Sequence, residues 1–146
     1  MEKFDKWNDE KKIIHQKDCS EVYVNIREIW YIKMWVNIWF EENGKTEFLR
    51  PVLVVKKVWN LFFTVALTSQ WKDNNYFYYK FKDLELSEKN KKYINSSYAI
   101  LSQVKTVDKK RFTQNVWIIS KQDFTNLQKS LKICYFKLNL FYLLNN

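Results

Sequence analysis

Apolar residues recur along the chain in short blocks that polar stretches separate. Two such blocks, 52–55 and 62–67, flank a short polar segment and predict two short buried strands. Further blocks at 29–40, 76–81, 97–104 and 117–119 are rich in β-branched or aromatic residues, a composition typical of strands. The middle of the chain is therefore predicted to be a run of strands.

Two longer segments at the ends of the chain have helical character. Residues 2–17 place scattered apolar side chains among charges, without glycine or proline, and predict an N-terminal helix. Near the other end, Ser120 and Asp123 resemble a capping box that opens a long C-terminal helix. An apolar stripe at helical spacing favours packing of this helix on the core: Phe124, Leu127, Leu131, Cys134, Tyr135 and Leu138. Asp108 in DKKRF predicts a separate capped helical turn.

The order of helix, strands and helix indicates an α+β fold or a small barrel in one domain of 146 residues. Lys and Arg number 25 against 16 acidic residues, so the net charge is +9. Such a charge favours a polyanionic or acidic partner, although surface solubility explains it equally well. Cys19 and Cys134 match neither a metal-ligand spacing nor a disulfide framework. With a charged N-terminus and a tail too short to cross a bilayer, we expect a soluble cytoplasmic protein without membrane contact.

The candidate chemistry lies at the ends of the two central strands. Arg50 precedes one strand and Thr68 ends the other, so that a cation and a hydroxyl lie where they could meet a phosphate. The polar loop 41–49 carries the lone glycine, Gly44, and either connects two strands or closes over a ligand. The only histidine, His15, is interpreted as a solvated residue at a helix end rather than as a catalytic group.

Five sequence segments, taken together and in order, resemble the MazF/PemK toxin family. They are REIWYIKM (27–34), LRPVLVV (49–55), VALTSQ (65–70), AILSQVKTVDKKRF (99–112) and ISKQDF (119–124). The resemblance implies a small SH3-like β-barrel in residues 20–146, with a long C-terminal helix and an extra N-terminal helix in residues 1–19. It also implies a toxin of a type II toxin–antitoxin system, with no cofactor and no metal, that forms a homodimer and binds a cognate antitoxin.

Members of this family cleave single-stranded RNA and leave a 2′,3′-cyclic phosphate and a 5′-hydroxyl. Carried over by motif, the resemblance makes Arg50 and Thr68 the catalytic pair. It further implies RNA-binding roles for Lys45, Ser69, Gln70, Gln103 and Lys105.

The cleavage chemistry is compatible with these residue types, because the 2′-hydroxyl of the RNA attacks the adjacent phosphorus. The site must supply charge for the phosphorane oxygens and a route for protons. Arg50 presents a fork of donors suited to phosphate, and Thr68 can orient an oxygen or relay a proton. No residue is assigned as the general base. Two alternatives stay open: a gyrase-poisoning toxin of the CcdB type, and a degenerate relative that only binds antitoxin or RNA.

The composition holds one anomaly, since there is one glycine but there are seven tryptophans. Five tryptophans fall in turns or at places where related toxins carry glycine: Trp35, Trp39, Trp59, Trp71 and Trp117. We hypothesise that UGA codons meaning glycine were translated as tryptophan. An AT-rich genome is the alternative, because it also favours the abundant Lys, Asn, Ile, Phe and Tyr.

Overall fold

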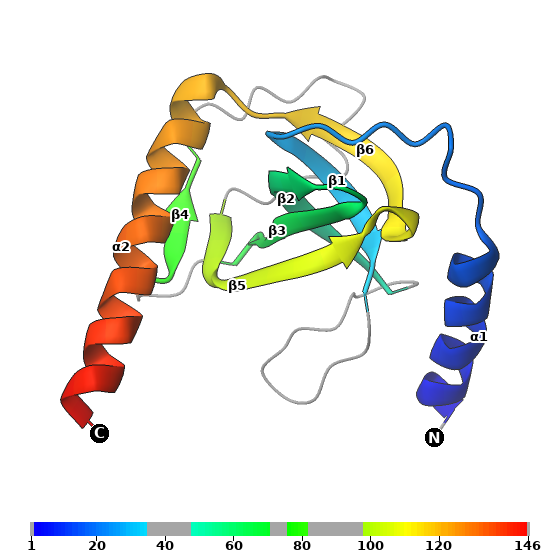
Figure 1. Ribbon diagram of the computed structural model, residues 1–146, viewed down its shortest axis with the longest axis horizontal. Helices are drawn as coiled ribbons and strands as arrows, with labels where there is room; N and C mark the ends of the chain where they lie inside the picture. The colour runs from blue at the N-terminus through cyan, green and yellow to red at the C-terminus, as the bar shows by residue number, and fades with distance from the viewer. Residues whose placement is uncertain (1, 35–47, 71–75, 82–97, 146) are drawn as a thin grey trace.

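The computed structural model describes residues 2–34, 48–70, 76–81 and 98–145 (Figure 1). Within these ranges the chain forms two α-helices, one 3-10 turn and six strands. In chain order they are α1 (Glu2–Gln16), β1 (Glu28–Lys33), β2 (Leu49–Val58), β3 (Leu61–Thr68), β4 (Tyr78–Lys80), β5 (Tyr98–Asp108), η1 (Lys109–Arg111), β6 (Phe112–Ile118) and α2 (Lys121–Asn145). The predicted α+β class is confirmed.

The six strands form one antiparallel sheet in the order β4-β5-β3-β2-β1-β6. The two strands predicted at 52–55 and 62–67 are its centre, and each is longer than predicted. They join through the two-residue turn Trp59–Asn60, with Val58 paired to Leu61. This hairpin is the local unit from which the sheet extends on both sides.

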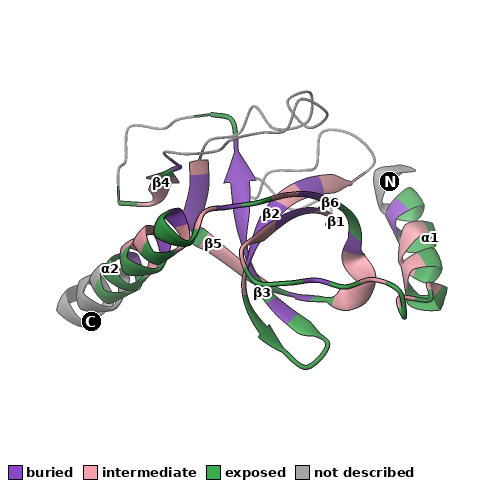
Figure 2. Cartoon of the chain, turned by 90° about the horizontal axis from the view of Figure 1, so that it is seen from above, coloured by how far each residue is buried: buried purple, intermediate pink, exposed green. Residues whose placement is uncertain are grey.

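Side chains alternate between two buried clusters on the two faces of the sheet. One face carries Ile29, Leu53 and Val65, which pack with Leu127 and Cys134 of α2. The opposite face carries a second cluster made of Val24, Trp30, Ile32, Val52, Val54, Phe62, Val107 and Phe112. Figure 2 shows the burial concentrated in the strands, while the tip of the β2–β3 hairpin is exposed. Apolar cores on both faces explain why the central strands read as continuous apolar runs.

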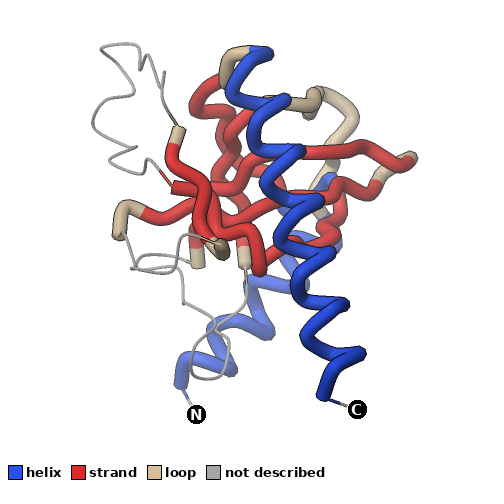
Figure 3. Tube along the Cα trace, turned by 90° about the vertical axis from the view of Figure 1, so that its left-hand side faces the viewer, coloured by secondary structure: helices blue, strands red, loops and turns tan. Residues whose placement is uncertain are grey.

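Helix α2 covers the first of these faces, and Figure 3 shows it lying across the strands. Its start is capped as predicted, because the backbone N–H of Asp123 donates to Ser120 Oγ at 3.0 Å. The buried Asp123 carboxylate also accepts a hydrogen bond from the Tyr79 hydroxyl at 2.9 Å, which ties α2 to β4. The predicted core stripe holds through Cys134 but fails at Tyr135, which is 41% exposed. Because Tyr135 follows Cys134 directly, it is turned by about 100° away from the sheet.

Helix α1 packs against the sheet near η1, at the side of the molecule away from α2 (Figure 1). Trp7 is fully buried and meets the Phe48 ring edge-on, with 5.1 Å between the centroids. Glu10 forms an ion pair with Lys33 of β1 at 3.1 Å. The N-terminal segment is thus a docked part of the fold.

Several predicted boundaries are corrected. The strand expected at 29–40 is a strand only as far as Lys33 within the described residues, and its continuation beyond residue 34 lies outside them. The strand predicted at 76–81 is reduced to three residues, whereas β5 and β6 extend the strands predicted at 97–104 and 117–119. The capped turn at Asp108 is confirmed, with its carboxylate accepting from the Lys110 N–H at 2.8 Å.

The tryptophans differ in their surroundings. Trp59 has a φ of 54° and is 87% exposed at the first position of the hairpin turn, where the left-handed region favours glycine. Trp117 instead lies half-buried in β6, paired with Ile29, and packs against the core. Its backbone therefore gives no reason for a glycine. Trp35, Trp39 and Trp71 lie outside the described residues.

Candidate functional site

Arg50 lies near the start of β2, where β2 is paired with β1 on one side but not yet with β3 on the other. It pairs with Ile32 of β1, while the ladder between β2 and β3 begins only at Val52 and Ala66. Pro51 separates the two positions, and its missing N–H is tolerated where a strand has a free side. Arg50 shares the face of Val52 and Val54 and is 5% exposed.

Gln103 reaches this same face because of an irregularity in β5. The register with β3 shifts between Val65, which pairs with Val104, and Leu67, which pairs with Ala99. Ala99 and Leu101 pack toward α2. In a regular strand Gln103 and Lys105 would share their face, because alternate residues point the same way, yet both line the opposite side. Strand irregularities of this kind redirect side chains. The Arg50 Nη2 donates to Gln103 Oε1 at 3.0 Å as a result.

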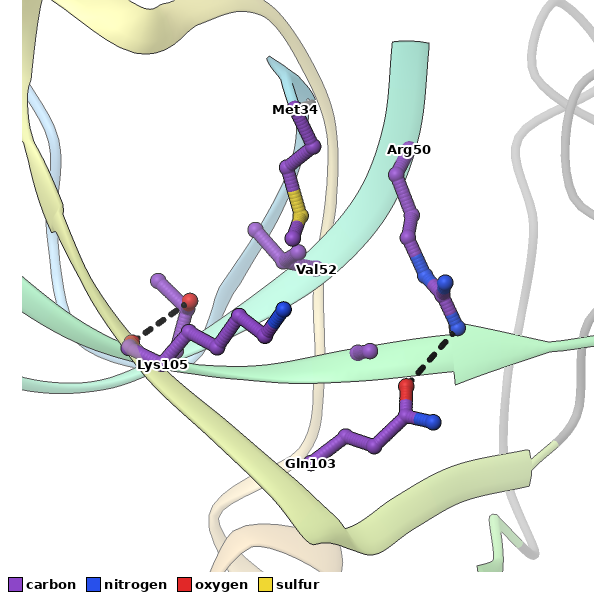
Figure 4. A pocket seen from close by; sticks show the side chains of 7 residues that line it. Met34, Arg50, Val52, Gln103 and Lys105 are labelled. Atoms are coloured by element: carbon purple, nitrogen blue, oxygen red, sulfur yellow. Dashed lines mark hydrogen bonds between the residues drawn. The ribbon is translucent and has the colours of Figure 1, made fainter. Parts of the chain in front are cut away.

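A small pocket surrounds this contact, and we refer to it as the Arg50 pocket (Figure 4). Its volume is about 10 Å³, which is room for one water-sized group. Figure 4 shows Lys105 and Arg50 extending into the same space from different strands. The walls are Met34, Arg50, Val52, Thr64, Ala66, Gln103 and Lys105.

The chemistry of this pocket is that of an anion site. Two of its lining side chains are cations, and among the residues that the structure describes none of those lining it is a carboxylate or a histidine. A buried guanidinium is costly unless it is hydrogen-bonded, and Gln103 provides one such bond. The carbonyl of Lys105 accepts a hydrogen bond from Thr64 Oγ1 at 3.0 Å, which fixes the strand that carries the lysine. The Arg50 guanidinium and the backbone that carries Lys105 are thus held in place before any ligand arrives.

The remaining predicted site residues lie around this pocket rather than in it. Extending the β2–β3 register by two residues sets Thr68 opposite Arg50, yet Thr68 does not line the pocket. Its Oγ1 accepts from the Gln70 N–H at 3.1 Å and so stabilises the end of β3. Ser69 and Gln70 are exposed beyond that strand end. Lys45 lies outside the described residues.

Sequence reasoning did not single out four lining residues: Met34, Val52, Thr64 and Ala66. Val52, Thr64 and Ala66 alternate with residues that face α2, so the two-residue period of a strand would have placed them on the face of Arg50. No such signal was available for Gln103, since its orientation depends on the irregularity in β5.

Other chemistry is sparse in the part of the chain that the structure describes. No three His, Cys, Asp or Glu side chains gather there as a metal site would require. Both cysteines are free thiols, and Cys134 of α2 is buried against the sheet. Among the described helices, none combines the length and apolar character needed to cross a membrane.

A family model for the PemK-like, MazF-like toxins of type II toxin–antitoxin systems matches residues 27–135. The chain belongs to this toxin family. The match includes every strand and the Arg50 pocket, and it begins after α1. No curated protein matches the chain.

Solved structures of toxins with the same fold are similar to this chain. One is an endoribonuclease in complex with its cognate antitoxin from a mycobacterial species, with 8% identity, a TM-score of 0.55, and coverage of 77% of this chain and 95% of that one. A second endoribonuclease from a mycobacterial species has 9% identity, a TM-score of 0.55, and coverage of 77% and 92%. The MazE–MazF complex from Deinococcus radiodurans has 15% identity, a TM-score of 0.50, and coverage of 75% and 92%. At these identities the likeness concerns the fold.

Proposed function

We propose that this toxin is an endoribonuclease that cleaves single-stranded RNA without a metal, leaving 2′,3′-cyclic phosphate and 5′-hydroxyl ends. The observation that carries the proposal is the buried, oriented guanidinium of Arg50 in a pocket that also receives Lys105. Family membership supplies the class of protein, and the pocket offers two cations for the charge on the phosphorane oxygens.

In the proposed site a phosphate lies over the Arg50 pocket with one non-bridging oxygen directed into it. The pocket has room for one group of that size. Arg50 and Lys105 then stabilise the negative charge that grows on the phosphorane, an effect that is strong where water is excluded. Gln103 orients the Arg50 guanidinium through its hydrogen bond. Thr68, across from Arg50 at the end of β3, is the proposed second catalytic group.

We assign the RNA strand a path over the exposed strand ends beside this pocket. Ser69 and Gln70 are exposed next to Thr68 and can donate to the RNA backbone or bases. Lys45 is retained as an RNA-binding residue on the family resemblance alone. The general base is not among the lining side chains, which hold no carboxylate and no histidine.

We further propose that the sheet is an SH3-like barrel, that the toxin acts as a cytoplasmic homodimer, and that a cognate antitoxin inhibits it. The net charge of +9 suits an acidic antitoxin segment that occupies the RNA-binding face. We keep residues 20–146 as the toxin domain and 1–19 as an extension, in keeping with a family match that begins at residue 27.

The test is the cleavage of a long RNA by purified variants in the presence of a chelator. Arg50→Ala is expected to lower the rate by about 10² or more, by analogy with the removal of an oxyanion donor. Arg50→Lys keeps the charge but loses the two-pronged donor and should recover part of the rate. Lys56→Ala removes an exposed cation of β2 outside the pocket and serves as the matched control. Cleavage by Arg50→Ala at the wild-type rate would remove Arg50 from the mechanism.

A further inference from the structure

A second basic site lies between α1 and η1, at the side of the sheet away from α2 (Figure 1). We call it the α1–η1 groove, and its volume is about 990 Å³. Four of its lining side chains carry a permanent positive charge and one is a carboxylate. The lining residues are Asn8, Lys11, Lys12, Ile14, His15, Gln16, Asp108, Lys110 and Arg111. The family match begins at residue 27 and so leaves α1 out.

The walls of the groove are held together by several independent contacts. Trp7 is buried against Phe48, and the Arg111 guanidinium lies over the Trp7 ring at 5.7 Å. Lys110 Nζ donates to the backbone carbonyl of His15, so η1 is joined directly to the end of α1. The groove is therefore a feature of the fold.

Among the four lining cations of the groove, Lys12 is the exposed one. Lys12 pairs with Asp9 at 3.0 Å, but both side chains are largely exposed, and an exposed pair contributes only about 0–1 kcal/mol. A phosphate can therefore compete for Lys12. The Asp108 carboxylate already caps η1 by accepting from the Lys110 N–H.

The groove and the Arg50 pocket adjoin through the end of β1. Arg111 Nη1 donates to the carbonyl of Lys33 at 3.1 Å, so a groove residue contacts β1 directly. The next residue along the chain, Met34, lines the Arg50 pocket. A polymer bound at one site thus has the other beside it.

We propose that the α1–η1 groove binds the phosphate backbone of single-stranded RNA that extends beyond the Arg50 pocket. The identity of the ligand rests on the proposed function. RNA fits better than an acidic peptide, because the lining offers cations and amides but a single apolar side chain, Ile14. A peptide helix in a groove needs several apolar anchors, whereas phosphate contacts need mainly Lys and Arg.

The test compares two variants with equal loss of charge. Lys12→Gln/Lys110→Gln alters the groove, and Lys129→Gln/Lys132→Gln alters exposed lysines on α2. Binding is measured with 2′-O-methyl RNA, which cannot be cut, using a long probe of about 20 nucleotides and a short one of about 5. The groove variant should bind the long probe about tenfold more weakly. The slope of log K against the logarithm of the salt concentration should become smaller in magnitude by about 0.7 per lost phosphate contact. The short probe and the α2 variant should bind as in the wild type.

Lys12→Glu, a single exposed substitution, repeats the test if the double variant does not fold. Equal weakening by the groove and α2 variants would overturn the proposal, and so would wild-type protein that binds long and short probes alike. The proposal would also be overturned, in favour of an acidic partner, if binding of a poly-glutamate peptide depended on the groove lysines while binding of RNA did not. Because the probe cannot be cut, the binding test does not depend on the proposed activity. Wild-type protein that binds the long probe through the groove but cuts no RNA would contradict the proposed activity alone.

Discussion

The hairpin turn at Trp59 allows the clearest stability prediction. With a φ of 54°, Trp59 occupies the left-handed region, which costs a residue with a Cβ about 1–2 kcal/mol. Of the two central residues of the turn, Trp59 has a positive φ and Asn60 does not. A type II′ turn has the same signs of φ, and it prefers glycine at its first central position. We therefore predict that Trp59→Gly stabilises the fold relative to Trp59→Ala.

The magnitude follows from opposing terms. Glycine removes the strain of about 1–2 kcal/mol but restores freedom to the unfolded chain, which costs about 0.4–1 kcal/mol. The net advantage of Trp59→Gly over Trp59→Ala is about 0.5–1 kcal/mol. In a domain of this size such a difference raises Tm by about 2–3 °C. Either variant loses little burial, because the indole is 87% exposed.

The assay is thermal and urea unfolding of both variants, with Trp117 as the matched control. Trp117 lies in β6 beside a register shift, but its φ is not positive and it packs on the core, so Trp117→Gly should be less stable than Trp117→Ala by about 0.5–1 kcal/mol. The order of the two substitutions thus reverses between the sites. The same order at both sites would refute the reasoning about the turn. A UGA codon at Trp59 would support the hypothesis of a translated glycine codon, and UGG at all five candidate positions would end it.

Three further predictions concern the core, a cap and the thiols. Leu127→Ala should lower the free energy of unfolding by about 2–5 kcal/mol, as measured by urea denaturation, because Leu127 is fully buried between α2 and the sheet. Ser120→Ala removes the cap of α2 and should cost about 1 kcal/mol in the same assay, whereas Ser120→Asp should retain most of it. Burial raises the pKa of the Cys134 thiol, so a thiol reagent should modify the half-buried Cys19 first in the native protein. Equal rates for the two cysteines in the folded state would contradict this packing of α2.

The existence of the strands and of both helices could be predicted from the sequence, because each segment carries its own local signal: apolar runs and β-branched or aromatic residues for the strands, and apolar residues at helical spacing for α2. The capped start of α2 and the turn at Asp108 were also predictable, since a cap is a contact between residues close in sequence. Tyr135 was assigned to the core in error, because a stripe of apolar residues does not show how wide the covered face is.

The site depends on contacts that no local pattern encodes. Arg50 and Thr68 were placed at strand ends from the sequence, and they fall on one face only when the β2–β3 register is extended by two residues beyond its first pair, Val52 and Ala66. The contact of Arg50 with Gln103 joins residues that are 53 apart in sequence and depends on the register shift in β5. Likewise, the burial of Trp7 against Phe48 and Arg111 creates a groove that neither α1 nor the DKKR segment predicts alone.

The most direct test of the proposed activity is the analysis of RNA ends after incubation with the purified toxin and a chelator. We predict fragments that carry a 2′,3′-cyclic phosphate and a 5′-hydroxyl, formed by the wild type and by Lys56→Ala but about 10² times more slowly by Arg50→Ala. RNA that the wild-type protein leaves intact, or fragments that end in a 3′-hydroxyl, would contradict the account.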